Sequence, residues 1–266
     1  MIAVETHPTL VDAERAMGAD ARFLGGGTIV MRAVNEGDIS FRRIVRARDA
    51  SLGAIRTEGR RLVLGAGVTM AAVAASPDCA ALAPVARQVA GPQIRTMATV
   101  GGNLHAAAPY GDFAAALLAL DATVRFADGS EQAVEAFLAE RDRSRRLVAA
   151  VALDRPERDA FRFAKLSRVR PKGVSVMSLA ARLPRAGGRL SGVRLAWGAM
   201  GPTPLRAKAA ERARVGRARD AAGIAEALRV AAEGLAPADD ALASAWYRRE
   251  VAPVFLRRLL LDEGRA

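Results

Sequence analysis

A run of three glycines places the strongest constraint on the fold of this chain. Gly25, Gly26 and Gly27 follow a strand predicted to end at residues 23–24, and an apolar run at residues 29–31 comes shortly after them. This order predicts a strand, a glycine turn and a helix. Because glycine has no side chain, backbone N–H groups in such a turn can approach an anion closely. No Gly-Lys-Ser/Thr follows, so the turn is not a P-loop.

A second glycine-rich segment lies at residues 93–104, with the sequence QIRTMATVGGNL. Thr99 and Asn103 flank its glycine pair, and Asp112 follows shortly downstream. A hydroxyl and an amide can hydrogen-bond phosphate oxygens, and a carboxylate suits ligand hydroxyls. Two separate glycine turns can bind one diphosphate from two sides. Taken alone, each turn is also compatible with a purely structural role.

A third glycine motif imitates the start of a dinucleotide-binding fingerprint. Residues 65–70 read GAGVTM after a predicted strand at residues 61–64. Met70 stands at the third glycine position, and no acidic residue follows about 20 residues later on a second strand. The motif therefore indicates a turn between two elements.

The hydrophobic pattern predicts an α+β fold with two domains. In the first half, the pattern predicts a helix at residues 9–17 and strands at residues 61–64 and 122–126. Asp128 and Gly129 form a hairpin-type turn after the last of these strands.

The pattern changes from Phe161 onward. Two long strands are predicted at residues 174–183 and 190–200, separated by a hairpin loop at residues 184–188. Helices follow at residues 220–233 and 242–261, and Pro253 is expected to bend the second or to start a new helix. A polar run at residues 154–159 places the boundary, giving domains at 1–158 and 159–266.

Composition narrows the function classes. The 266 residues are 51% hydrophobic, which is enough for two modest cores, and the formal net charge is +12. The basic residues are scattered through periodic segments with few aromatics, and no nucleic-acid motif accompanies them. We therefore expect no nucleic-acid partner, but an arginine-rich surface with one docking face for an acidic partner subunit. A basic, cofactor-free module that binds nucleic acid remains the alternative outside the enzymes.

The sequence shows no signal peptide, no apolar run long enough to span a membrane and only one cysteine. The first ten residues carry no Lys or Arg and no apolar core of a signal peptide follows, and the apolar runs are too short to cross a bilayer. We expect a cytoplasmic protein with no membrane insertion. The single Cys79 cannot hold an iron–sulfur cluster or a zinc ion by itself, so we expect it in the core and predict no metal site.

Four segments resemble a known family. Residues 93–121 resemble the second FAD-binding stretch of the flavoprotein subunit of xanthine, carbon monoxide and related molybdenum dehydrogenases. Residues 24–28 resemble its first FAD loop, although Gly25 replaces the usual alanine. Residues 195–207 and 245–249 resemble its C-terminal domain. The segments occur in the family's order and cover nearly the whole chain.

The resemblance implies a two-part FAD-binding domain followed by a smaller C-terminal α+β domain of a β-hairpin or sheet plus helices. It also implies a cofactor-binding set of Gly25, Gly26, Gly27, Thr28, Ala98, Thr99, Gly102, Asn103, Asp112 and Lys165. The glycine loops would contact the FAD diphosphate, and Asp112 would reach cofactor hydroxyls. His105 follows the second loop, but nothing in the sequence pairs it with a carboxylate, so no catalytic residue is assigned.

The resemblance further implies an electron-transfer subunit of a molybdenum hydroxylase complex. Its expected partners are a small subunit with iron–sulfur clusters and a large subunit with the molybdenum cofactor, and its acceptor would be NAD, a quinone or oxygen. A stand-alone FAD oxidoreductase acting on a small molecule is the alternative enzyme. The absence of an obvious polar substrate constellation argues against that alternative.

Overall fold

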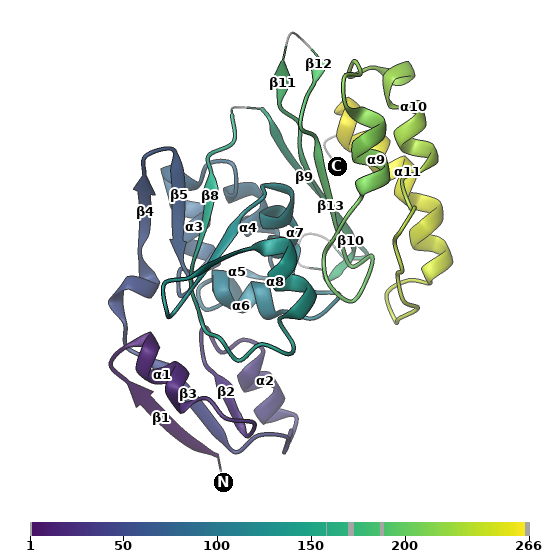
Figure 1. The fold of residues 1–266 in the computed structure, drawn as a ribbon. Coiled ribbons are helices and arrows are strands. Elements are labelled where there is room, and N and C mark those ends of the chain that lie inside the picture. The colour runs from purple at the N-terminus through teal and green to yellow at the C-terminus, as the bar shows by residue number, and fades with distance from the viewer. Residues whose placement is uncertain (1, 158, 170–172, 187–188, 264–266) are drawn as a thin grey trace. The chain divides into compact units, whose positions relative to one another are not determined.

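The structure is a computed structural model that describes residues 2–157, 159–169, 173–186 and 189–263. The chain forms two compact units, which Figure 1 shows as a ribbon. The first comprises Met1–Ala106 and Ala122–Asp154, and the second comprises Ala107–Asp121 and Arg155–Ala266. Residue 158, at the expected domain boundary, lies outside the described residues.

The first unit begins with a small parallel sheet. Its strands are β1 (Ala3–His7), β2 (Ala21–Phe23) and β3 (Arg43–Ala47), in the order β1-β3-β2. Parallel neighbours need crossover connections, which the helices α1 (Leu10–Ala16) and α2 (Val30–Asn35) supply. The Thr9 hydroxyl accepts a hydrogen bond from the Asp12 amide and caps α1. The predicted helix at residues 9–17 and the strand–glycine turn–helix order are confirmed.

An antiparallel sheet of order β4-β5-β8-β6-β7 forms the rest of this unit's β structure. Its strands are β4 (Ile55–Glu58), β5 (Arg61–Gly65), β6 (Thr123–Phe126), β7 (Glu131–Ala133) and β8 (Val148–Asp154). The strand β8 is buried along most of its length in the centre of the sheet. Gly129 has φ of +82° in the β6–β7 turn, which confirms the predicted hairpin.

Short helices complete the first unit. They are η1 (Ala50–Gly53), α3 (Met70–Ala75), η2 (Pro77–Cys79), α4 (Ala83–Gln88), α5 (Pro92–Arg95), α6 (Val100–His105) and α8 (Val134–Glu140). The glycines of the third motif pack on η1: a Cβ atom on Gly65 would overlap the Leu52 carbonyl oxygen, and one on Gly67 would lie 3.0 Å from it. The motif is therefore a structural turn, as its sequence predicted.

The second unit is built on an antiparallel sheet of order β14-β13-β10-β9. Its strands are β9 (Phe161–Ser167), β10 (Ser175–Arg182), β13 (Arg194–Gly198) and β14 (Leu205–Arg206). The pairing of β10 with β13 confirms the two predicted long strands, although both are shorter than expected. Between them, β11 (Arg185–Ala186) and β12 (Arg189–Leu190) pair in the expected hairpin, whose residues 187–188 lie outside the described part.

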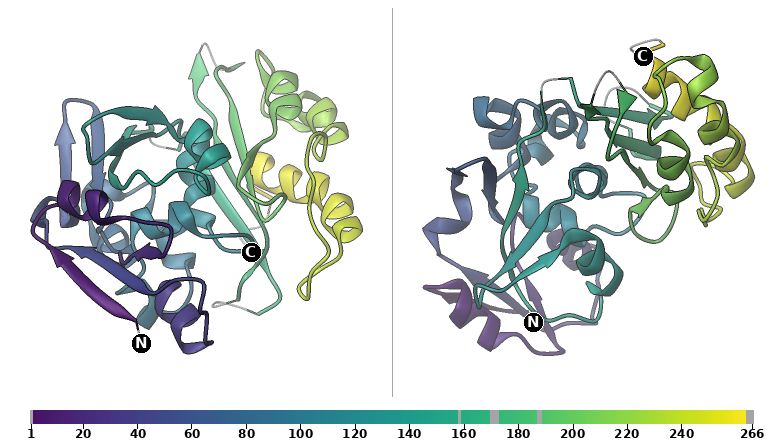
Figure 2. Two further views of the ribbon diagram at one scale, coloured as in Figure 1. Left: turned by 60° about the horizontal axis from the view of Figure 1, so that its bottom comes forward. Right: turned by 45° about the horizontal axis from the view of Figure 1, so that its top comes forward.

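Helices cover both faces of this sheet (Figures 1 and 2). One face carries α7 (Asp112–Ala119); the other carries α9 (Lys208–Arg214), α10 (Ala221–Arg229) and α11 (Ala245–Leu261). The core on the second face surrounds the fully buried Trp197, which packs against Phe255 of α11. Pro253 lies within α11, so it does not start a new helix.

The helix α7 changes the expected division of the chain. It comes from the first half of the sequence, yet it packs on β10 and β13 and belongs to the second unit. All eight of its residues are buried. A Cβ atom on Gly198 would be in ordinary contact with that of Ala115 in α7, at 3.5 Å, but would overlap the Ser178 hydroxyl of the neighbouring strand β10. Asp112 at the start of α7 is therefore structurally part of the second unit.

Candidate cofactor-binding site

The two glycine loops of the first unit touch each other. A Cβ atom on Gly26 would overlap the carbonyl oxygen of Met97. A Cβ atom on Gly25 would lie 3.1 Å from the Thr99 hydroxyl. Side chains at either glycine would therefore press the loops apart, and the structure brings together the two segments that the sequence predicted to act on one ligand.

The first loop presents a row of backbone donors. Within the part of the chain that the structure describes, the amides of Gly25, Gly26, Gly27, Thr28 and Ile29 donate to no acceptor. The amides on both sides are bonded: Leu24 N donates to Val45 O and Met31 N to Gly27 O, each at 2.8 Å. Gly27 has φ of +76°, a backbone conformation that makes successive amides converge on one point.

Consecutive amides without acceptors call for an acceptor from outside the chain. Gly26, Gly27 and Thr28 are only half-exposed, and an unpaired amide costs free energy as it leaves water. An anion with several oxygens satisfies such a row best. The loop is thus chemically suited to a phosphate or diphosphate.

The second loop uses its own amides differently from our expectation. The Gly102 amide donates to the Thr99 hydroxyl at 3.1 Å, and this bond caps the N-terminus of α6. The Gly101 amide donates to Ala66 O at 2.8 Å, and the Val100 amide donates to Val68 O at 2.9 Å. These three amides are already bonded within the chain, so they are not free to donate to a ligand. What the glycines of this loop offer a ligand is a surface without side chains.

The other predicted residues of the second loop fix its shape. Asn103 is buried and its Nδ2 donates to Thr99 O at 2.9 Å. The carbonyl of buried Ala98 accepts from the Met70 amide at 2.8 Å. At the far end of α6, buried Arg141 donates from Nη1 to Leu104 O at 2.5 Å, and the His105 ring packs edge-on against Phe137. No local sequence pattern marks Arg141 for this contact.

The remaining two predicted residues form a buried ion pair in the second unit. Lys165 Nζ lies 2.9 Å from Asp112 Oδ2, and the two side chains are 6% and 8% exposed. Ser175 donates from Oγ to Asp112 Oδ1 at 2.6 Å. The sequence analysis named Asp112 and Lys165 as cofactor-binding residues without expecting them to pair, and it did not name Ser175. A serine in a strand is a common residue, so only the fold could single it out.

No metal centre emerges from the described residues, in which no three His, Cys, Asp or Glu side chains gather to hold an ion. Cys79 is 1% exposed and belongs to the core of the first unit, as predicted. In the same described segments, no helix has both the length and the apolar composition needed to span a bilayer.

Comparison with known families identifies the two units. A loop with free amides beside a second glycine turn is suited to a phosphorylated cofactor. Residues 2–153 match the FAD-binding domain in molybdopterin dehydrogenase, and residues 162–262 match the CO dehydrogenase flavoprotein C-terminal domain. The chain belongs to the family of FAD-binding medium subunits of molybdenum hydroxylases, and its cofactor is FAD.

Individual relatives agree with this assignment. The carbon monoxide dehydrogenase medium chain of Afipia carboxidovorans is 31% identical over 91% of this chain and 88% of its own length. The putative xanthine dehydrogenase FAD-binding subunit of Escherichia coli is 30% identical over 76% of this chain and 75% of its own length. Among solved structures, reconstituted CO dehydrogenase from Oligotropha carboxidovorans superposes with a TM-score of 0.86 at 28% identity, covering 98% of this chain and 96% of that one.

Proposed function

We propose that this chain carries electrons within a molybdenum hydroxylase complex, holding FAD by its diphosphate at the two glycine loops. One observation carries the proposal. Five consecutive amides, from Gly25 to Ile29, have no acceptor among the described residues and lie against the second glycine loop. A diphosphate carries enough oxygens to accept from both ends of such a row.

The residues of the first unit divide the work of binding. The amides of Gly25, Gly26 and Gly27 donate to phosphate oxygens, and the Thr28 hydroxyl adds a further donor. Thr99 keeps the second loop in shape through its cap on α6. Gly102 leaves room for the ligand, because only the Thr99 hydroxyl lies near the position of a Cβ atom there.

In this proposal Asp112 and Lys165 of the second unit also bind the cofactor, and Asp112 reaches its hydroxyls. Asp112 holds the Lys165 ammonium group at a fixed place, and Ser175 orients the carboxylate. Each carboxylate oxygen has two lone pairs, so Asp112 can accept from a cofactor hydroxyl while it keeps Lys165 and Ser175.

FAD supplies the redox chemistry, because it takes up electrons singly and releases two together. The chain supplies binding, orientation and electrostatics. The proposed donors are the iron–sulfur clusters of a small subunit, fed by a large subunit with the molybdenum cofactor, and the acceptor is NAD, a quinone or oxygen. Two relatives support this: one is a medium chain of carbon monoxide dehydrogenase and one is an FAD-binding subunit. We also propose a cytoplasmic location.

Affinity purification of the full-length tagged chain from its own cells tests the proposal. We expect one FAD per chain together with iron, molybdenum and two further polypeptides. The released flavin is separated by chromatography after acid extraction, which distinguishes FAD from FMN. A chain that carries FAD, lacks both metals and oxidises a small molecule alone would replace the subunit by the stand-alone oxidoreductase.

A further inference from the structure

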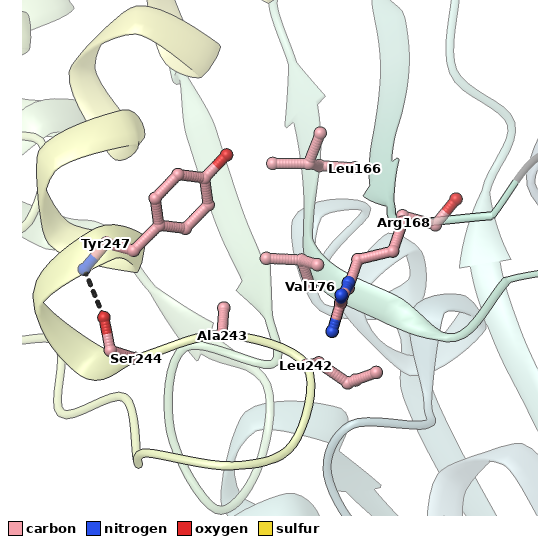
Figure 3. Close-up of a pocket in the computed structure, with 8 residues that line it drawn as sticks. Leu166, Arg168, Val176, Leu242, Ala243, Ser244 and Tyr247 are labelled. Carbon is pink, nitrogen blue, oxygen red and sulfur yellow. Dashed lines mark hydrogen bonds between the residues drawn. The ribbon is translucent and has the colours of Figure 1, made fainter.

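A cavity opens in the second unit beside the start of α11. Its volume is about 300 Å³. Its walls are mainly apolar, with one cation and one phenol, and Figure 3 shows its lining residues Leu166, Arg168, Val176, Leu242, Ala243 and Tyr247. This volume is at the lower end of the range for small-molecule pockets, so the cavity suits a small ligand.

The cavity is distinct from the Lys165–Asp112 pair. Successive side chains of a strand point to opposite faces of a sheet. On β9, Lys165 points to the face covered by α7, where it meets Asp112. Its neighbour Leu166 points to the opposite face, where it packs against the core shared with α11 and lines the cavity. A ligand in the cavity therefore lies across the sheet from this pair.

A buried arginine holds one wall of the cavity in place without a ligand. Arg248 is 1% exposed and donates to Val176 O at 2.8 Å, to Ala238 O at 2.6 Å and to Ala243 O at 2.9 Å. Its remaining nitrogen holds both carboxylate oxygens of Asp240. These bonds fix the loop at residues 238–243 against β10. A ligand then binds to a wall that is already ordered, so none of its binding free energy is used to order the loop.

Arg168 gives the cavity its charge. Its Nη1 donates to Ala241 O at 3.2 Å, and a guanidinium group has five N–H donors in all. Among the described residues, no carboxylate forms an ion pair with Arg168. Asp240, the acidic residue of the adjoining loop, is already bonded to Arg248 and to the amides of Leu242 and Ala243. The positive charge at the cavity therefore lacks a partner from those parts of the chain.

The remaining wall selects for shape. The Tyr247 ring reaches into the space from α11, and Leu166 and Val176 lie across from it (Figure 3). An aromatic ring and branched aliphatic side chains favour a flat apolar body. We propose that this cavity is a binding site for a small carboxylate with a planar apolar body, whose carboxylate pairs with Arg168 and whose body packs against Tyr247. The residues that line it all belong to the second unit.

Benzoate and its neutral isostere benzamide test the site on the full-length chain, with affinities measured by ligand-observed NMR or calorimetry. We expect benzoate to bind about two- to fivefold more tightly than benzamide, since one ion pair with an exposed arginine contributes up to about 1 kcal/mol. Arg168→Met removes the charge and should abolish the preference. Arg249→Met makes the same change of net charge on exposed α11 surface outside the cavity and should retain it.

Two results would overturn the proposal. One is that the wild-type chain binds benzoate and benzamide with equal affinity, or binds neither of them. The other is a preference for benzoate that survives in Arg168→Met. The melting temperature and the FAD content of each variant show that it is folded. Because the assignment of FAD rests on the family match of the first unit and not on this cavity, neither result changes it.

Discussion

The carbonyl oxygen of Met97 occupies the place that a Cβ atom on Gly26 would need. Both partners in this contact are backbone, so neither can move aside by rotating a side chain. The contact sets the separation of the two glycine loops, which form the proposed binding site for the FAD diphosphate. A glycine at position 26 is therefore required by packing within the chain.

Gly26→Ala should consequently weaken FAD binding, because the methyl group must push the loops apart. We expect the dissociation constant for FAD to rise at least about tenfold, a loss of about 1.4 kcal/mol or more in binding free energy, and the FAD content of the purified variant to fall. Absorbance of the bound flavin measures it. Gly53→Ala is the matched control, since no atom lies within 4 Å of a Cβ atom there. Normal flavin content in Gly26→Ala would show that the two loops do not bind the ligand together.

Two threonines allow a sharper test of the second loop. Thr99 caps α6 and Thr69 caps α3, each with a 3.1 Å bond, and the two residues form an isolated β-bridge. Replacing either by alanine should destabilise the fold by about 1 kcal/mol. Only Thr99→Ala should also weaken FAD binding, and Thr99→Ser should restore it. Equal flavin affinity in Thr99→Ala and Thr69→Ala would mean that α6 does not contact the cofactor.

The buried ion pair predicts a strong penalty for removing one partner. Asp112→Asn or Lys165→Met leaves one charge without its counterpart in a site that is less than a tenth exposed, and each should cost roughly 3–5 kcal/mol of unfolding free energy. Urea unfolding of the apoprotein measures this loss. The exposed pair Glu226–Arg229 is the control, where Glu226→Gln should cost less than about 1 kcal/mol. Similar losses at both pairs would contradict the burial argument.

Acid should weaken the second unit through Asp240. Desolvation acts to raise its pKa, but hydrogen bonds from Arg248 and from the amides of Ala243 and Leu242 outweigh it and hold the pKa below the ordinary value of 3.8. A carboxyl group with a depressed pKa stabilises the fold above its unfolded pKa and loses that contribution as the pH falls through its folded pKa. Asp240→Asn should therefore be less stable than wild type at pH 7, with the difference shrinking below pH 4. A difference that stays constant down to pH 2.5 would contradict this.

The complex-level assignment predicts an inactive single chain. In the proposed complex the large subunit with the molybdenum cofactor oxidises the substrate, so the isolated chain should not oxidise xanthine, aldehydes or carbon monoxide. Slow reduction of artificial dyes by the FAD-loaded chain is compatible with this expectation. Assays of the metal-free chain with each substrate check it, and robust hydroxylation would overturn the subunit role.

Local patterns predicted much of the fold, and the exceptions have physical causes. Capped helices and hairpin turns depend on neighbouring residues, so the helix after Thr9 and the turn at Gly129 were predictable. The strand β8 is apolar on both faces and lacks the alternation that marks a half-buried strand. The helix α7 is buried all round, so it lacks an amphipathic stripe as well.

The candidate site could likewise be predicted only where local sequence patterns mark it. Glycine motifs are visible along the chain, and both loops were expected to act on one ligand. The contact between Gly26 and Met97 joins residues about seventy positions apart, which no local pattern encodes. Ser175 was missed for the same reason, because its role depends on meeting Asp112 across 63 positions. The bonding of the Gly102 amide to Thr99 was readable in principle, since Thr-Val-Gly-Gly is an N-cap pattern.

The position of Arg248 has a consequence for how the second unit opens. One guanidinium group joins β10, the loop at residues 238–243 and α11, and no carbonyl of this set can be released without leaving a buried donor unpaired. The three segments should therefore unfold as one cooperative unit, with backbone amides that exchange hydrogen at a common opening free energy. Arg248→Lys supplies a single ammonium group in place of the planar fork. In that variant the loop and the first turn of α11 should exchange faster than β10, so that one opening event separates into two.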